Sequence, residues 1–200
     1  NEALGIRQTI ESLARILPRQ NIFVVSDGSR DDTVPVAKNS GVSVLELSES
    51  RGKAGALVAG LKHFDLLRHF AAVLFADADT VLKEDYLANA LPFFRDRRVA
   101  AVAGYARTMC YPRKLSGEQK FMVLHRDRIY FLSQMLLKFG QTWRHTNVTN
   151  IVPGFASIYR SSALAKIDLN PSGLVIEDFN MTFEIHHKDL GLIAHHPRVV

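Results

Sequence analysis

The chain has 200 residues, of which 47% are hydrophobic and 22% are charged, values typical of a globular protein that buries a core. The 25 lysines and arginines exceed the 20 acidic residues by 5, an excess too small and too scattered to indicate a nucleic-acid-binding protein. The single cysteine, Cys110, excludes an intramolecular disulfide and a zinc site built from cysteines.

Helical and strand patterns alternate along the first half of the chain. Apolar residues recur at a helical period over residues 4–17, and Pro18 ends that helix. The predicted strands are short apolar runs, at residues 22–25, 42–45, 71–76 and 99–107. Further helices are predicted at about residues 53–70 and 83–94. Ser29 and Asp32 have the spacing of a capping box for a short helix after the first strand.

The second half is dominated by one long predicted helix at residues 116–139. Its apolar residues are interrupted by His125, Arg126, Asp127 and Arg128, so it cannot span a bilayer. It either packs on the core, the interpretation that we favour, or lies with an amphipathic face on a membrane surface. A strand from Ile151, helices and a last strand follow, the helices at residues 161–166 and 177–188 and the strand near Leu192.

This order of elements predicts an α/β fold with a mostly parallel sheet flanked by helices. No membrane span and no signal peptide are visible in the sequence. The chain starts at Asn1 close to a helical pattern and stops at Val200 in an expected strand. We therefore expect that both ends are truncated and that the chain is part of a longer protein.

Acidic residues follow two of the predicted strands. Asp27 comes after the strand at 22–25, and Asp77 and Asp79 come after the strand at 71–76. In open α/β sheets, ligands bind beyond the carboxyl ends of the strands. Two carboxylates spaced two residues apart point the same way in an extended chain, and a divalent cation between them relieves their repulsion. The pattern predicts Mg²⁺ or Mn²⁺ bound together with the oxygens of a substrate diphosphate.

A second acidic pair, Glu177 and Asp178, opens the last predicted helix. Carboxylates at a helix N-terminus stabilise the helix, which is the structural interpretation of this pair. An apolar run, Leu174 to Ile176, precedes it and brings the pair out of a buried segment. A carboxylate in that position is also suited to take a proton from a hydroxyl nucleophile.

Six motifs in one order carry a family resemblance. They are Asn1-Glu2, Ser26 to Thr33, Arg51 to Leu57, Asp77 to Thr80, Pro153-Gly154-Phe155 and Glu177-Asp178. With these motifs the sequence resembles the family 2 glycosyltransferases of the GT-A fold, which include cellulose, chitin and hyaluronan synthases. The resemblance covers nearly the whole chain. It implies a single GT-A domain over residues 1–200, with a nucleotide-binding half at about 1–107 and an acceptor half at about 108–200.

The resemblance implies roles for the donor-side residues. Asp27 is expected to hold the base or ribose of the nucleotide, and Lys53 to lie near the nucleotide. Asp77 is expected to contact the nucleotide and the metal, Mn²⁺ or Mg²⁺, and Asp79 to coordinate that metal on the diphosphate. A UDP-sugar is the donor that the resemblance favours.

On the acceptor side, the resemblance assigns to Asp178 the role of the base that activates the acceptor hydroxyl. The other residues expected on this side are Gly154, Phe155 and Glu177, with Tyr159 and Arg160. A single displacement from the opposite face then inverts the anomeric carbon without a covalent intermediate. The implied acceptor is a carbohydrate or a lipid-linked molecule, and the implied place is the cytoplasmic side of a membrane, within a longer protein.

Several alternatives stay open. Asp27 is also compatible with a plain turn, and Lys53 with a solvated lysine at the start of a helix. Asp31 and Asp32 are also compatible with helix caps. His186 and His187 are expected at the surface, whereas His195 or His196 is a candidate third metal ligand, and Trp143 stacks on a sugar or packs in the core. As functions, a non-catalytic nucleotide-sugar-binding domain and a nucleotidyltransferase compete. So does a haloacid-dehalogenase-type phosphatase that uses Asp77 as its nucleophile, although that motif normally opens its domain.

Overall fold

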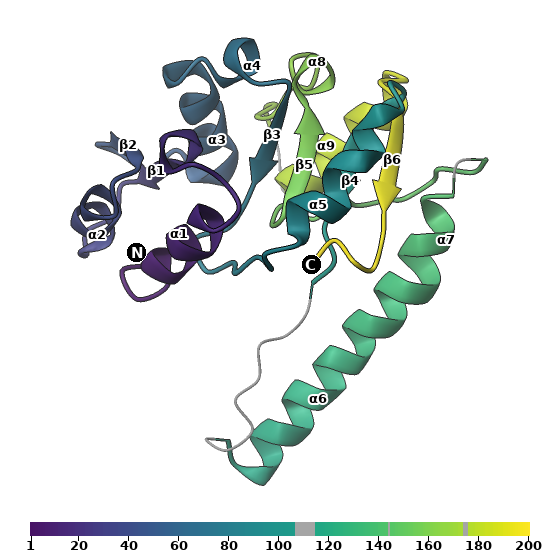
Figure 1. The fold of residues 1–200 in the computed structure, drawn as a ribbon, viewed down its shortest axis with the longest axis horizontal. Helices are drawn as coiled ribbons and strands as arrows, with labels where there is room; N and C mark the ends of the chain where they lie inside the picture. The colour runs from purple at the N-terminus through teal and green to yellow at the C-terminus, as the bar shows by residue number, and fades with distance from the viewer. Residues whose placement is uncertain (107–114, 144, 174–175) are drawn as a thin grey trace.

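The computed structural model describes residues 1–106, 115–143, 145–173 and 176–200. Its strands form two separate sheets, and helices cover the faces of both (Figure 1). The predicted α/β class is therefore confirmed. The proposed division into a nucleotide-binding half and an acceptor half stays a prediction.

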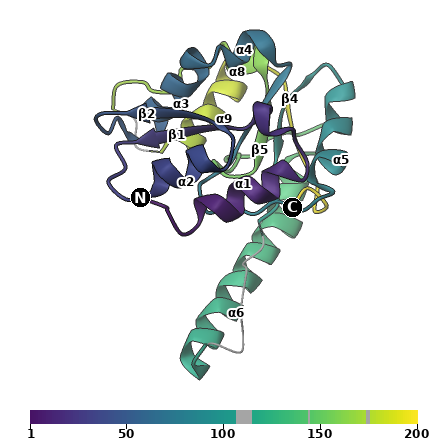
Figure 2. The same cartoon turned by 60° about the vertical axis from the view of Figure 1, so that its left-hand side comes forward.

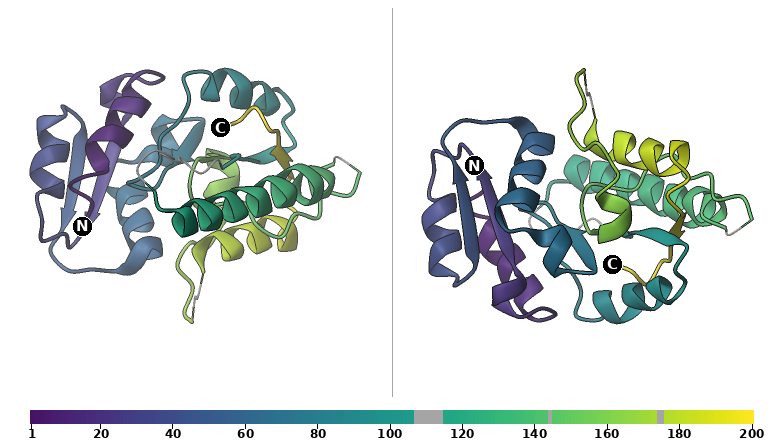
Figure 3. Two further views of the ribbon diagram at one scale, coloured as in Figure 1. Left: turned by 90° about the horizontal axis from the view of Figure 1, so that it is seen from below. Right: turned by 90° about the horizontal axis from the view of Figure 1, so that it is seen from above.

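The first sheet pairs β1 (Phe23–Asp27) with β2 (Ser43–Leu47) in parallel. Helices α1 (Ile6–Ala14) and α2 (Thr33–Asn39) pack together through Ile6, Ile10 and Ala37, and a 3-10 turn, η1 (Arg19–Asn21), precedes β1. In Figure 3, these purple and blue elements form a group of their own at one side of both views.

The second sheet has the order β3-β5-β4-β6. Its strands are β3 (Ala72–Phe75), β4 (Val99–Ala103), β5 (Ser157–Arg160) and β6 (Leu192–His195). Strand β5 is antiparallel to β3 and to β4, whereas β4 and β6 are parallel. Strands β3, β4 and β6 thus run in one direction and β5 runs in the opposite one, so the parallel pair of this sheet is β4–β6. All five residues of β4 are buried, which places the core at the centre of this sheet.

Two predicted helices are divided in the structure. Residues 53–70 form α3 (Gly52–His63) and α4 (Leu66–His69), because Asp65 between them adopts a left-handed conformation with φ 49°. Residues 83–94 form only α5 (Tyr86–Ala90) and a 3-10 helix, η2 (Leu91–Arg95), which has a proline in its first turn. The strand expected from Ile151 begins only at Ser157. The short helix α8 (Ser161–Leu164) follows β5, and α9 (Glu177–His187) precedes β6.

The predicted capping box of Ser29 and Asp32 is wrong. Asp32 is the N-cap of α2, but its side chain makes no capping hydrogen bond. The Asp31 carboxylate accepts the Thr33 amide at 3.1 Å and the Ala3 amide at 3.1 Å instead. Asp31 therefore ties the start of α2 to the N-terminal segment, as expected of a structural rather than a ligand-binding carboxylate.

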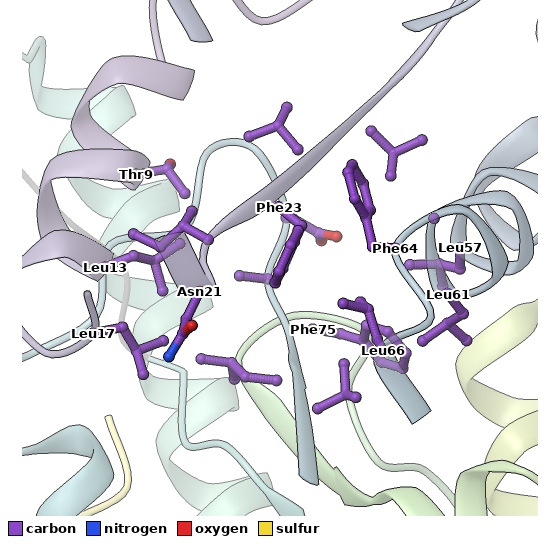
Figure 4. A pocket seen from close by; sticks show the side chains of 18 of the residues that line it. Thr9, Leu13, Leu17, Asn21, Phe23, Leu57, Leu61, Phe64, Leu66 and Phe75 are labelled. Atoms are coloured by element: carbon purple, nitrogen blue, oxygen red, sulfur yellow. The ribbon is translucent and has the colours of Figure 1, made fainter. Parts of the chain in front are cut away.

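A mostly apolar hollow of about 550 Å³ separates the two sheets (Figure 4). Strand β1 lines it on one side and β3 on the other, and neither strand pairs across it. Helix α1 contributes Thr9 and Leu13 to its walls, and α3 contributes Leu57 and Leu61. At one end the hollow reaches the carboxyl ends of both strands, at Asp27 and Asp77. The ends of β1 and β3 therefore lie at the same rim.

The long helix of the second half projects from the body of the molecule (Figures 1 and 2). It consists of α6 (Gly117–Leu132), a π-helical segment η4 (Ser133–Lys138) and α7 (Phe139–Gln141). Ser116 and Gln119 form a capping box at its start. No residue of α6 is buried, so our prediction that this helix packs on the core is wrong for α6. Only η4 packs inward, through Gln134 and Lys138.

The exposed apolar residues of α6 do not lie on one face. Phe121, Met122 and Leu124 are all more than 60% exposed, and at about 100° per residue Met122 lies about 160° around the helix from Leu124. The amphipathic alternative needs a polar face opposite an apolar one, and this distribution does not provide it. Among the described residues, no helix combines the length and the apolar composition that crossing a bilayer requires.

Candidate active site

Lys53 joins two carboxylates from distant parts of the chain. It is the second residue of α3, and its Nζ lies 2.7 Å from Asp77 Oδ1 and 3.0 Å from Glu177 Oε1. Partial burial lowers the pKa of Lys53, but the hydrogen bonds to Asp77 and Glu177 outweigh it, so the pKa is raised above its ordinary value. The ammonium is therefore held charged between the end of β3 and the start of α9.

The contact with Lys53 also affects the pKa of Glu177. Burial raises the pKa of its carboxyl, whereas a backbone hydrogen bond and the Lys53 ammonium lower it, and the net shift is downward. We expected Glu177 on the acceptor side, yet its partner is Lys53, which the resemblance assigns to the nucleotide side. The structure brings Asp77, Lys53 and Glu177 together in one cluster.

Asp178 is held by two backbone amides. The Gly154 N–H donates to Asp178 Oδ2 at 3.2 Å, and the Phe179 N–H donates to Asp178 Oδ1 at 2.8 Å. The residue lies in the first turn of α9, where the helix dipole stabilises negative charge. It is half-buried, next to Glu177 in the chain, and makes no ion pair in the described part of the structure. Its carboxylate thus has a fixed orientation and lone pairs left to accept a proton.

Gly154 leaves the space in which these groups meet. A Cβ atom at this position would lie 2.9 Å from Lys53 Nζ and 3.3 Å from Glu177 Oε1. The missing side chain therefore permits the loop before β5 to approach the cluster closely. Phe155, also expected on the acceptor side, is half-buried and packs against the core cluster that contains Tyr86 and Val102.

Asp27 fastens the loop that leads into α3. Its Oδ1 accepts the Arg51 amide at 2.7 Å, and its Oδ2 accepts the Ser50 hydroxyl at 2.7 Å. Gly28 follows in the left-handed region with φ 69°, which suits a turn built on glycine. Asp27 therefore sets the start of the helix that carries Lys53.

We expected an extended backbone at Asp77 and Asp79, and the structure has a turn there. Residues 77–80 form a turn, in which the Thr80 amide donates to the Asp77 carbonyl at 3.0 Å, so the chain is not extended there. Asp79 is exposed, whereas Asp77 is bound to Lys53. In the ranges that the structure describes, no three His, Cys, Asp or Glu side chains are grouped closely enough to hold a metal ion.

The oxygens of Asp77 and Asp79 nevertheless fit a hard cation. Mg²⁺ and Mn²⁺ are commonly held by one or two carboxylates, with water and substrate phosphate as the other ligands. One oxygen of Asp77 and the exposed carboxylate of Asp79 are free of ion pairs among the described residues. His195, a candidate third ligand, is 4% exposed and its Nδ1 lies 3.0 Å from the Ala103 carbonyl oxygen, so it packs in the core instead.

Three further candidate residues, two histidines and a tryptophan, are exposed. His186 and His187 are exposed on α9, as predicted; His187 stacks on Phe183. Trp143 is 61% exposed and contacts His145, and it does not pack in the core.

Two buried polar residues near Asp178 have surroundings that the sequence analysis did not predict. They are Lys138 on η4, which is 9% exposed, and Tyr159 on β5, which is 1% exposed. Tyr159 was expected near the acceptor, but not as a buried hydroxyl without a hydrogen-bond partner among the described residues. The sequence offers one hint that Lys138 is buried. Lys138 and Gln134 are polar residues four positions apart, and they flank the apolar run Met135 to Leu137.

The sequence profile described as "Glycosyl transferase family 2" matches residues 1–167 of this chain. The chain belongs to this family. The match decides against the phosphatase alternative, since Asp77 then stands within a glycosyl transferase domain and not at the start of a haloacid-dehalogenase domain.

Curated relatives are polysaccharide synthases. The poly-β-1,6-N-acetyl-D-glucosamine synthase of Staphylococcus epidermidis is 24% identical over 208 residues, which covers 100% of this chain and 47% of the relative. The Staphylococcus aureus synthase of the same name is 23% identical over 192 residues, covering 93% of this chain and 43% of the relative. The chain thus spans about half the length of the curated relatives that it matches.

Solved structures with the same fold include a complex of S. aureus TarS 1-349 with UDP-GlcNAc, at a TM-score of 0.65 and 19% identity over 96% of this chain and 52% of that chain. A second is glucosyl-3-phosphoglycerate synthase from Mycobacterium tuberculosis with Mn²⁺ and UDP-glucose, at a TM-score of 0.61 and 18% identity over 98% of this chain and 64% of that chain. These similarities confirm the GT-A fold that the motifs predicted.

Proposed function

We propose that this chain is the catalytic domain of an inverting glycosyltransferase. It transfers a sugar from a nucleotide-diphosphate donor to an acceptor hydroxyl. The observation that carries the proposal is the Lys53 bridge, which holds Asp77 after β3 and Glu177 at the start of α9 in one cluster, with Asp178 beside it. Family membership supports the reaction class.

In this reaction the acceptor oxygen attacks the anomeric carbon while its proton passes to Asp178. The bond from the anomeric carbon to the diphosphate oxygen breaks, and the diphosphate leaves with the electron pair. Asp178 suits the base because two amides fix its orientation at a helix N-terminus. Lys53 supplies positive charge where the diphosphate gains negative charge, and Asp27 holds the loop that positions Lys53.

The donor that we propose is a UDP-sugar, since solved relatives of the same fold bind UDP-GlcNAc and UDP-glucose. Asp77 and Asp79 are the residues that would hold Mn²⁺ or Mg²⁺, which when bound neutralises charge on the leaving diphosphate. The named synthase relatives suggest a carbohydrate acceptor, with a lipid-linked one as the other case. They also suggest a longer, membrane-associated protein that works on the cytoplasmic side.

The test is calorimetric titration of UDP, UDP-GlcNAc and UDP-glucose into the full-length protein that contains this chain, with and without Mn²⁺. We expect binding that strengthens with Mn²⁺ in the wild type and loses that dependence in Asp79→Ala. Lys83→Ala, an exposed residue shortly after the turn, is the matched control and should bind like the wild type. Binding that ignores both the metal and the Asp79 substitution contradicts the metal assignment. If the protein binds these donors but an assay of sugar transfer detects no product, the non-catalytic alternative is supported.

A further inference from the structure

The helix that projects from the molecule ends by inserting two polar side chains into the core. Gln134 and Lys138 lie four residues apart in the π-helical segment η4 and point to the same side, and both are buried. The Gln134 amide accepts the Ala106 N–H at 2.7 Å and donates to the Ala106 carbonyl at 2.9 Å. This double hydrogen bond anchors η4 just beyond the end of β4. Lys138, one turn later, is thereby directed into the interior.

The Lys138 ammonium has no carboxylate partner in contact. Among the described residues, no Asp or Glu oxygen lies within 4.0 Å of its Nζ, and no hydrogen bond from Nζ is present. The titratable groups around it are Asp178 from α9, whose negative charge attracts it, and His195 from β6. Burial lowers the pKa of Lys138 to about 8, and Asp178 opposes that shift. Lys138 is therefore a buried cation with three N–H donors to satisfy.

A further polar group near Asp178 also lacks a partner in the described part of the chain. The buried Tyr159 hydroxyl has no hydrogen bond among the described residues, and the charges of Asp178 and Glu177 act on it. Buried polar groups without partners are rare in folded proteins. Lys138 and Tyr159 come from two separate elements, η4 and β5, and the charge of Asp178 acts on both.

We propose that Lys138 binds the acceptor. Its ammonium donates hydrogen bonds to hydroxyl oxygens of the acceptor saccharide and so positions the attacking hydroxyl at Asp178. A saccharide is the ligand class that fits, since its hydroxyls accept from an ammonium and donate to a carboxylate side by side. Lys53 has a different role, because its ion pairs with Asp77 and Glu177 place it at the proposed donor diphosphate. The assignment rests on the proposed glycosyl transfer and adds a residue to its acceptor side.

The test compares Lys138→Met and Lys138→Arg with the wild type in the full-length protein. The substrates are UDP-GlcNAc and a short β-1,6-linked N-acetylglucosamine oligomer, as the named relatives suggest. For Lys138→Met we expect the KM for the oligomer to rise about tenfold or more while the Kd for UDP-GlcNAc stays unchanged. In the wild type, the KM for the oligomer should rise above pH 8. In Lys138→Arg it should stay level to pH 9, because guanidinium keeps its proton. Lys120→Met, an exposed lysine on α6, is the control.

The outcomes separate this assignment from the proposed function. Sugar transfer by the wild type, with oligomer KM and pH profile unchanged in Lys138→Met, overturns the role of Lys138 and leaves the glycosyl transfer intact. An equal loss of donor affinity also overturns it, since Lys138 would then act on the donor or the fold. Absence of transfer by the wild type from any UDP-sugar overturns both. Should Lys138→Met fail to fold, the pH profiles of the wild type and Lys138→Arg decide the matter alone.

Discussion

Glu177 and Lys53 form an ion pair, with Oε1 and Nζ 3.0 Å apart, although one opens α9 and the other lies in the first turn of α3. The pair links the two parts of the chain to which the motifs assign donor and acceptor. Because Lys53 also contacts Asp77 at 2.7 Å, its ammonium is the centre of the candidate site.

Lys53→Met should weaken the binding of UDP-sugars. A hydrogen bond to a charged group contributes about 1.5–3 kcal/mol, so we expect a loss of about 10–100-fold in affinity, with a smaller loss for Lys53→Arg. Titration of UDP-GlcNAc measures it. Lys62→Met, an exposed lysine on the same helix, serves as the control. Unchanged affinity in Lys53→Met would remove Lys53 from the donor site.

Gly154→Ala should impair the site without unfolding the protein. The added Cβ would lie 2.9 Å from Lys53 Nζ and force the ammonium away from Glu177, so we expect sugar transfer to fall about tenfold. Gly117→Ala, where nothing lies within 4 Å, is the matched glycine control. Transfer rates and melting temperatures of both variants check this. Wild-type activity in Gly154→Ala would mean that the close approach of the loop is irrelevant to catalysis.

Gly60→Ala tests the packing of α3 on β1. A Cβ at this position would lie 2.6 Å from Val25 Cγ2, and a β-branched side chain has little room to move. We expect the free energy of unfolding to fall by about 1–3 kcal/mol. Gly140→Ala in α7 meets no atom within 4 Å and should leave stability unchanged or raise it by about 0.5–1 kcal/mol. Denaturant unfolding of both variants gives the comparison, and equal stabilities would refute the packing argument.

The sequence predicted the order of the elements, and the reason is physical. Apolar runs such as Ile22 to Val25 report local burial, and acidic residues after them mark strand ends. Hence Asp27, Asp77 and Glu177 were found where the structure places the ends of elements. Periodicity says nothing about which strands pair, so the reversed direction of β5 was not predicted.

The sequence was less informative about the site itself. Asp77 and Asp79 lie in a turn because the Thr80 amide donates to the Asp77 carbonyl. No residue type in this segment distinguishes such a turn from an extended chain. Lys138 resembles any helical lysine, and its burial depends on the Gln134 anchor to Ala106. The first feature is a local hydrogen bond and the second a contact between distant segments, and composition and spacing reveal neither.

His195 makes stability depend on pH. Burial lowers its pKa to about 4, so between pH 6.5 and 4 the unfolded chain binds a proton that the folded chain does not. Stability from this group is complete above pH 6.5 and is lost as the pH falls toward 4, by about 3 kcal/mol at about 1.4 kcal/mol per pKa unit. The difference in unfolding free energy between wild type and His195→Asn should shift by this amount. Parallel curves from pH 7 to 4 would refute the buried neutral imidazole.

The most direct test of the account is the separation of binding from transfer in Asp178→Asn. We expect the Kd for the UDP-sugar to stay at the wild-type value while the rate of transfer falls at least about 100-fold, because an amide cannot take the proton of the acceptor hydroxyl. Asp85→Asn, an exposed aspartate that makes no side-chain capping bond, should behave like the wild type in both measurements. Transfer at the wild-type rate, or donor binding lost together with transfer, would contradict the role of Asp178 as the base.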